Sequence, residues 1–133
     1  MPVARCACGA LTVTIPCYSE TVVVCHCDAC KRRTGSAFGV GMYVDAATTT
    51  IDGAYAGYDR ITASGATFRT SFCPGCGSAL FWTTERHPDA IGIAYGSFCD
   101  PALPPPIRSV WEEKAQVWAT IPAALHHFPR GRS

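Results

Sequence analysis

Seven of the nine cysteines in this 133-residue chain lie in three tight clusters, and their spacing constrains the fold more than any other feature. The clusters are Cys-Ala-Cys-Gly at residues 6–9, Cys-His-Cys-Asp-Ala-Cys at 25–30 and Cys-Pro-Gly-Cys-Gly at 73–77. Thiols so close in sequence are poorly placed to bridge one another, because such a short disulfide loop is strained. They are well placed to hold a soft tetrahedral cation, and zinc is the usual ion in cysteine-rich sites. The two pairs can close one four-thiolate site, whereas the triplet leaves a coordination position open.

The composition indicates an intracellular protein whose fold is stabilised by bound metal. The length suits a single domain over residues 1–133. A net charge of +1 with 16% charged residues gives no field that would recruit nucleic acid or anionic lipid. No apolar run reaches the roughly 18 residues that a membrane helix needs, and the N-terminus lacks the apolar core of a signal peptide. Cysteines without a secretory signal predict reduced thiols, metal binding and a cytoplasmic location.

Short β-branched and aromatic segments predict a mainly β fold. The predicted strands are residues 10–15, 21–24, 38–44, 48–51, 67–72, 79–83 and 91–95. Turns are predicted at Gly53, Gly57, Gly65, Gly75 and Gly77. Helical turns are predicted only at residues 109–116 and 122–127, so the cysteine triplet falls on a loop that follows a strand. The larger aromatic residues are predicted to form core and pocket walls rather than a base-stacking surface: Phe72, Phe81, Trp82, Trp111 and Trp118.

The order of three motifs resembles the glutathione-dependent formaldehyde-activating family, which also includes centromere protein V. The motifs are Cys6 to Gly9, Cys25 to Phe38 and Phe72 to Ser78. Residues 94–101 resemble the family's Gly-Thr-Leu-Asp-Asp-Pro segment, with Cys99 at its first acidic position. A late tryptophan and a Leu-x-x-Phe ending also fit. The resemblance extends over roughly residues 3 to 129.

This resemblance implies a β-tent fold, in which folded antiparallel sheets are clasped by zinc. It implies two zinc ions per chain, the first being structural. The four thiolates that would hold this structural zinc are those of Cys6, Cys8, Cys73 and Cys76. An ion that joins such distant residues closes a long loop and removes its entropy from the unfolded state. The glycines that follow Cys8 and Cys76 suit the positive-φ turns of such corners.

The resemblance also implies a catalytic zinc held by Cys25, Cys27 and Cys30, because family members condense glutathione with formaldehyde to S-hydroxymethylglutathione. The expected function is therefore a zinc-dependent carbon–sulfur lyase type of enzyme, with a small thiol and a small aldehyde as its partners. Zinc at an open site lowers the pKa of a bound thiol and so creates the nucleophile. One alternative is a second structural zinc, whose fourth ligand would be one of Cys17, Cys99, His26 and His87. Two others are a non-catalytic binding module like centromere protein V, and an enzyme acting on another thiol or electrophile.

The residues that follow the triplet are expected to bind the substrate. Arginine and lysine attract carboxylates, and backbone and hydroxyl donors can add hydrogen bonds. The expected contacts are Lys31, Arg32, Arg33, Thr34, Gly35 and Ser36. A solvated loop that offsets the thiolate charge is the alternative. Between the ligands, His26 is expected to point away from the metal and to hydrogen-bond within the loop. Cys17 is expected to behave as a small apolar residue.

Overall fold

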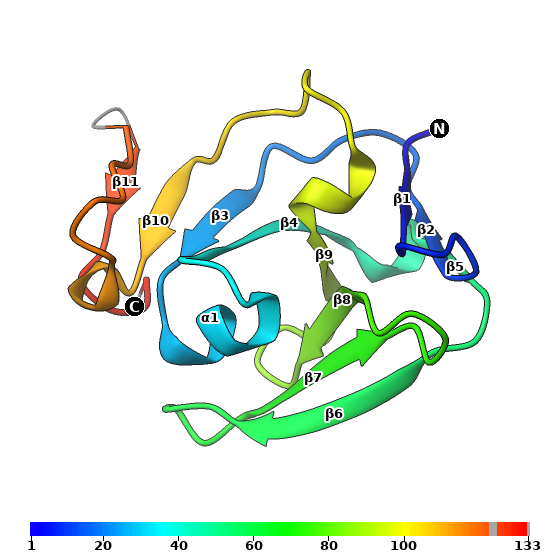
Figure 1. Cartoon of the computed structure of the whole chain (residues 1–133), viewed down its shortest axis with the longest axis horizontal. Coiled ribbons are helices and arrows are strands. Elements are labelled where there is room, and N and C mark those ends of the chain that lie inside the picture. The colour runs from blue at the N-terminus through cyan, green and yellow to red at the C-terminus, as the bar shows by residue number, and fades with distance from the viewer. Residues whose placement is uncertain (123–124, 133) are drawn as a thin grey trace.

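The computed structural model describes residues 1–122 and 125–132, which form two β-sheets (Figure 1). The three-stranded sheet has the order β1-β2-β5, with bounds Val3–Arg5, Thr12–Thr14 and Thr50–Asp52. The eight-stranded sheet has the order β11-β10-β3-β4-β9-β8-β7-β6. In that order its strands are His126–His127, Arg108–Val110, Val22–Cys25, Gly39–Asp45, Ala90–Ala94, Ala79–Thr84, Thr67–Phe72 and Ala56–Ile61. Neighbouring strands are antiparallel, except that β10 runs parallel to both β3 and β11. The predicted mainly β fold is confirmed.

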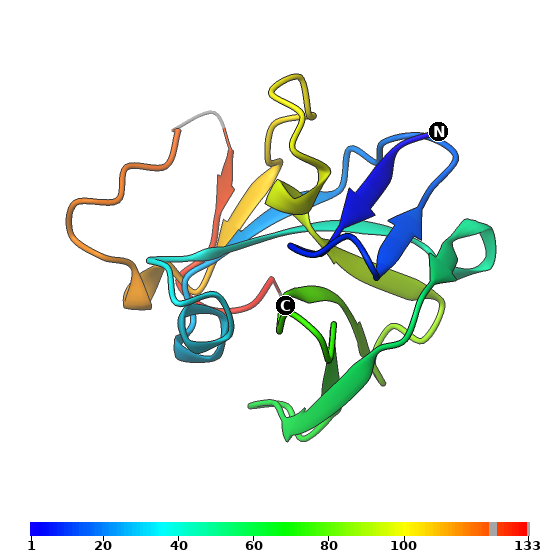
Figure 2. The same cartoon turned by 45° about the vertical axis from the view of Figure 1, so that its right-hand side comes forward.

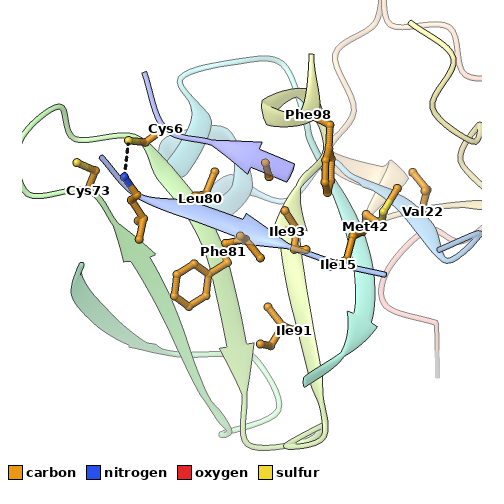
Figure 3. Packing of buried hydrophobic residues seen from close by; sticks show 13 residues of the cluster. Cys6, Ile15, Val22, Met42, Cys73, Leu80, Phe81, Ile91, Ile93 and Phe98 are labelled. Atoms are coloured by element: carbon orange, nitrogen blue, oxygen red, sulfur yellow. Dashed lines mark hydrogen bonds between the residues drawn. The ribbon is translucent and has the colours of Figure 1, made fainter. Parts of the chain in front are cut away.

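The core lies between the small sheet and one face of the large sheet. Val22, Met42, Ile93 and Phe81 are successive partners across β3, β4, β9 and β8, so they share one face. All four are buried (Figure 3), and they belong to the same hydrophobic cluster as Val13 of the small sheet. Full burial of one such side chain stabilises the fold by about 1.5–3 kcal/mol.

The opposite face of the large sheet carries a different set of residues, because side chains alternate along each strand. Cys25, Gly41, Tyr43 and Trp82 lie on this second face, each one position from a core residue. The helix α1 (Asp28–Thr34) follows β3, and the strands β6 to β8 turn to the same side of β3 and β4 (Figures 1 and 2). The helix α1 and the strands β6 to β8 therefore partly cover the second face of the large sheet.

All seven predicted strands are present, with ends that differ by a few residues. Residues 28–34 form a helix, however, so the prediction of a loop through the triplet is wrong. The helix has Asp28 in its first turn and basic residues in its last, which suits its dipole. It ends at Gly35, whose φ of 67° allows its N–H to cap the carbonyl of Lys31. Seven residues without an apolar period gave no helical pattern to detect.

The strand β6 was not predicted, and Gly57 lies inside it rather than in a turn. The Arg69 guanidinium lies over Gly57, in the space that a Cβ would occupy, so glycine lets this side chain pack against the strand.

The predicted helical turns near the C-terminus are mostly wrong. Residues 109–116 contain the end of β10 and a short 3₁₀ turn, η3 (Glu112–Lys114). Residues 126–127 form β11, and residues 123–124 lie outside the described part of the chain. Two further 3₁₀ turns are η1 (Ala46–Thr48) and η2 (Tyr95–Phe98). None of the helices in the described residues is long and apolar enough to cross a membrane.

Candidate active site

Four cysteines meet where the small sheet joins the large one. Cys6 and Cys8 lie on the turn after β1, and Cys73 and Cys76 lie on the turn between β7 and β8. Their four sulfurs all lie within 4.8 Å of one another. The Sγ atoms of Cys6 and Cys8 are 3.6 Å apart, and those of Cys8 and Cys73 are 3.7 Å apart. A tetrahedral ion with Zn–S bonds of about 2.3 Å holds its sulfurs ~3.8 Å apart, so this cluster fits zinc without rearrangement.

The two turns have the backbone that this cluster requires. Gly9 and Gly77 have φ values of 79° and 77°, as the sequence predicted. The N–H of Ala7 donates to the Ser78 hydroxyl at 2.9 Å and ties the turns together. Hydrogen bonds from the Ser78 side chain and backbone lower the pKa of the Cys76 thiol to about 5. A backbone hydrogen bond with Ala10 acts to lower the pKa of Cys8, but the neighbouring Cys6, Cys73 and Cys76 thiols raise it to about 11. Cys76 is thus prepared to present a thiolate, whereas a cation is needed to ionise the whole cluster.

The other three clustered cysteines lie where β3 passes into α1. Cys25 ends β3, Cys27 is the N-cap residue of α1, and Cys30 lies in the helix. The three sulfurs lie within 4.8 Å of one another, and the N–H of Cys30 donates to the Cys27 sulfur at 3.4 Å. Hydrogen bonding with the Cys25 and Cys30 thiols lowers the pKa of Cys27, and hydrogen bonding with Cys27 and Cys30 raises the pKa of Cys25. The three thiols therefore do not ionise equally on their own, and a bound cation would let all three ionise.

The triplet opens on a cavity of about 320 Å³ on the second face of the large sheet. All three cysteines line this thiol cavity, together with Tyr43, Trp82, Val110 and other residues. Two glycines on β4 leave space for side chains that form the walls of this cavity. A Cβ on Gly41 would lie 2.6 Å from the Trp82 ring, and one on Gly39 would lie 2.6 Å from an Arg33 nitrogen. The strand residues beneath the cavity are small because large side chains lie over them.

In the described residues, no fourth His, Cys, Asp or Glu joins the triplet. His26 is fully buried and its Nε2 lies 3.0 Å from the hydroxyl of Ser109 on β10, so the expectation of a hydrogen bond within the loop is wrong. His87 is exposed. Cys17 and Cys99 are also exposed and belong to neither cluster, so the expectation that Cys17 packs as an apolar residue is wrong. The triplet therefore differs from the four-cysteine cluster in having a side that faces a cavity.

Two arginines reach the thiol cavity from different elements. The Arg33 guanidinium, from α1, lies 4.0 Å from the centroid of the Trp82 ring, close to Cys30. Arg60, from β6, lies 4.4 Å from the centroid of Phe68, and that ring stacks on Trp82. Each of the two cations thus lies over one ring of a stacked aromatic pair that lines the thiol cavity. Sequence analysis missed Arg60, because its strand has no apolar alternation.

The other residues expected to bind substrate lie elsewhere. Arg32 lines a neighbouring groove with Arg33 and Arg60. The amine of Lys31 donates to the carbonyl of Lys114 at 2.6 Å and to the side chain of Gln116 at 2.7 Å, so it holds the C-terminal segment.

Three residues at the end of α1 serve to terminate the helix. The Thr34 hydroxyl donates to the carbonyl of Cys30 and accepts from the N–H of Ser36, while Gly35 is the cap. These three residues do not line the thiol cavity.

Trp111 is held in a strained conformation at the cavity wall. Its φ of 57° and ψ of 38° are left-handed, which is a genuine outlier for a bulky side chain. Backbone hydrogen bonds from Trp111 to Arg130 and from Glu112 to Phe128 hold it there. The prediction that Trp111 and Trp82 form pocket walls is confirmed. It is wrong for Trp118, which is 71% exposed.

Comparison with known proteins agrees with this geometry. The model of the family described as glutathione-dependent formaldehyde-activating enzyme matches residues 1–119, which include both cysteine clusters and α1. The chain belongs to this family. Membership in the glutathione-dependent formaldehyde-activating enzyme family supports chemistry of the formaldehyde-activating, carbon–sulfur lyase type, and its two cysteine clusters could bind metal ions.

A solved structure also resembles this family member. A crystal structure of a Rhodobacter sphaeroides protein has a TM-score of 0.57 and 19% sequence identity, over 71% of this chain and 85% of that one. At this identity the likeness supports the fold alone. No match was found among curated proteins.

Proposed function

We propose that this protein is a zinc-dependent enzyme of the carbon–sulfur lyase type that joins glutathione, or a similar small thiol, to formaldehyde or another small aldehyde. One observation carries the proposal: three clustered thiols open on a cavity that also contains two guanidinium groups. Four-cysteine clusters of the structural kind are closed, whereas a three-ligand site with free space is the arrangement found in catalytic zinc sites. The reduced thiols also suit the cytoplasm, where we place the protein.

The two clusters have different roles in this proposal. Cys6, Cys8, Cys73 and Cys76 hold the structural ion, and the triplet at residues 25–30 holds the second. The second ion, when bound, lowers the pKa of a substrate thiol, so that the thiolate is present at neutral pH. In the reaction a bond forms between this sulfur and the aldehyde carbon. The carbonyl π electrons move to oxygen, which takes up one proton, and the product is a hydroxymethyl thioether. The reverse reaction breaks the same bond.

The residues of the chain bind and orient the two reactants. Arg33 and Arg60 bring positive charge to the cavity and attract the carboxylates of an anionic thiol. The Tyr43 hydroxyl accepts a hydrogen bond from the Trp82 indole at 3.2 Å, so its own proton is available to another acceptor. Burial raises the pKa of Tyr43, so it stays protonated at neutral pH and can donate to the aldehyde oxygen. Trp82 and Trp111 limit water around the reacting atoms.

The test is exchange NMR of glutathione and formaldehyde with and without the full-length protein, with zinc content measured on the same samples. The wild type should accelerate adduct formation and contain two zinc ions per chain, one of which Cys27→Ser should lose together with the acceleration. Cys17→Ser replaces an exposed cysteine outside both clusters and is the matched control, expected to behave as wild type. A zinc-loaded wild type without acceleration would contradict the proposal and favour a binding module.

A further inference from the structure

A second cavity, of about 450 Å³, adjoins the thiol cavity on the same face of the large sheet. The two cavities share Val23, Tyr43, Trp82 and Val110 as walls. Arg108 lies on this face, because it is paired with Val23 on β3. Two residues farther along the same two strands, Val110 is paired with the ligand position Cys25. The second cavity therefore lies next to the triplet, because its wall residue Val110 is the strand partner of Cys25.

Positive charge gathers in this second cavity. Arg108 and Arg132 both line it, and His87 lies at its edge. None of the described residues that line it is acidic, and neither arginine forms an ion pair with another residue in ranges 1–122 and 125–132. Burial, followed by the nearby charge of Arg132, lowers the pKa of Arg108. Two like charges held close together around one cavity are unfavourable until an anion joins them.

The remaining polar groups of the cavity are hydroxyls. Thr21, Thr83 and Thr84 line it, and a hydroxyl can donate to an anion at the same time as a guanidinium does. The aromatic wall formed by Tyr43 and Trp82 supplies an apolar surface between these donors and the triplet. This combination suits a small organic acid with an apolar or amide stem rather than a bare ion.

We propose that Arg108 and Arg132 bind a carboxylate of the thiol substrate and thereby determine its specificity. This inference rests on the proposed function, because it assigns the cavity to the same substrate. Arg33 and Arg60 line the thiol cavity, whereas Arg108 and Arg132 line the second cavity, and Trp82 belongs to the wall of both. Carboxylates can therefore be bound in each of the two adjoining cavities. The preferred substrate class is therefore a thiol with carboxylates on both sides of its sulfur. Small thiols with one carboxylate or none would leave one arginine pair without its anion.

The test measures binding without chemistry. S-methylglutathione has both carboxylates but no free thiol, so its binding to the full-length, zinc-loaded protein is measured by titration calorimetry. Arg108→Gln and Arg132→Gln should each raise its Kd about tenfold, equivalent to ~1.4 kcal/mol, because each removes a charged hydrogen-bond donor to the carboxylate. The matched control is Arg5→Gln, which changes an exposed arginine on the small sheet and should leave Kd unchanged. The dimethyl ester of the same ligand should bind weakly and equally to all four proteins.

The outcomes separate this inference from the proposed function. Binding that depends on Arg108, in a protein that does not accelerate adduct formation, supports the carboxylate site and removes the proposed function. Acceleration by the wild type, with the same Kd in wild type and Arg108→Gln, overturns the site alone. Failure of the wild type to bind S-methylglutathione also overturns it. Inorganic phosphate is titrated in parallel, and tighter Arg108-dependent binding of phosphate would show that the cavity is not a carboxylate site. Melting temperatures of the variants confirm that each protein is folded.

Discussion

Gly92 tests whether the position of Trp82 organises both cavities. A Cβ at Gly92 would lie 2.5 Å from Cε2 and 2.7 Å from Cδ1 of Trp82, and closer still to its ring nitrogen. Real Cβ atoms do not approach so closely, and the indole is only 3% exposed, between Phe68 and Arg33. Gly92→Ala must therefore displace the ring. Overpacking of this kind costs about 1–3 kcal/mol, from which ~0.4–1 kcal/mol is regained because alanine restricts the unfolded chain.

The net expectation is a loss of about 1–2 kcal/mol in the free energy of unfolding, measured by urea titration. Displacement of the indole should also change the near-UV circular dichroism and weaken binding of S-methylglutathione by about tenfold, equivalent to ~1.4 kcal/mol. Gly96→Ala is the matched control, since a Cβ there meets nothing within 4 Å and the residue is exposed. If Gly92→Ala equals Gly96→Ala in stability and binding, Trp82 is not the fixed wall that the packing indicates.

Three further predictions concern the metal clasp, the strained tryptophan and the C-terminal strand. Cys76→Ser should remove one zinc and lower the free energy of unfolding by several kcal/mol, whereas Cys99→Ser should leave both unchanged, by metal analysis and urea titration. Trp111→Gly should be more stable than Trp111→Ala by about 1 kcal/mol, the reverse of the usual order, since glycine removes the left-handed strain; the usual order would refute the strain. His127 donates from one ring nitrogen to Glu112 at 2.7 Å and from the other to a carbonyl, and the Glu112 bond raises its pKa. This stabilisation is complete below the unfolded value of about 6.5 and is lost as pH rises through the raised folded pKa. The stability difference between wild type and Glu112→Gln should therefore be larger near pH ~6 than near pH ~9, and a constant difference would exclude the charged pair.

The local parts of the fold were predictable from the sequence, because they depend on neighbouring residues. β-Branched and aromatic residues identified strands such as 67–72 and 79–83, and both are present. Spacing and glycine placement anticipated that Cys73 and Cys76 would lie on a tight corner with positive φ at Gly77. Short polar elements gave weaker signals. The helix α1 was missed for this reason, and so was the edge strand β6.

The cysteine pattern alone determined that the chain carries two thiol pairs and one thiol triplet, since each of these is local and thiols at that spacing suit a cation. The tertiary structure brought the two pairs together into one four-thiol group, although they lie far apart in the sequence. Only the tertiary structure decided which side of the triplet is open and what surrounds it. Arg60 meets Arg33 through β6, and Arg108 approaches Cys25 through the parallel pairing of β10 with β3. These encounters depend on which strands become neighbours. Strand order comes from long-range packing of a shared face, and no local pattern of residues encodes it.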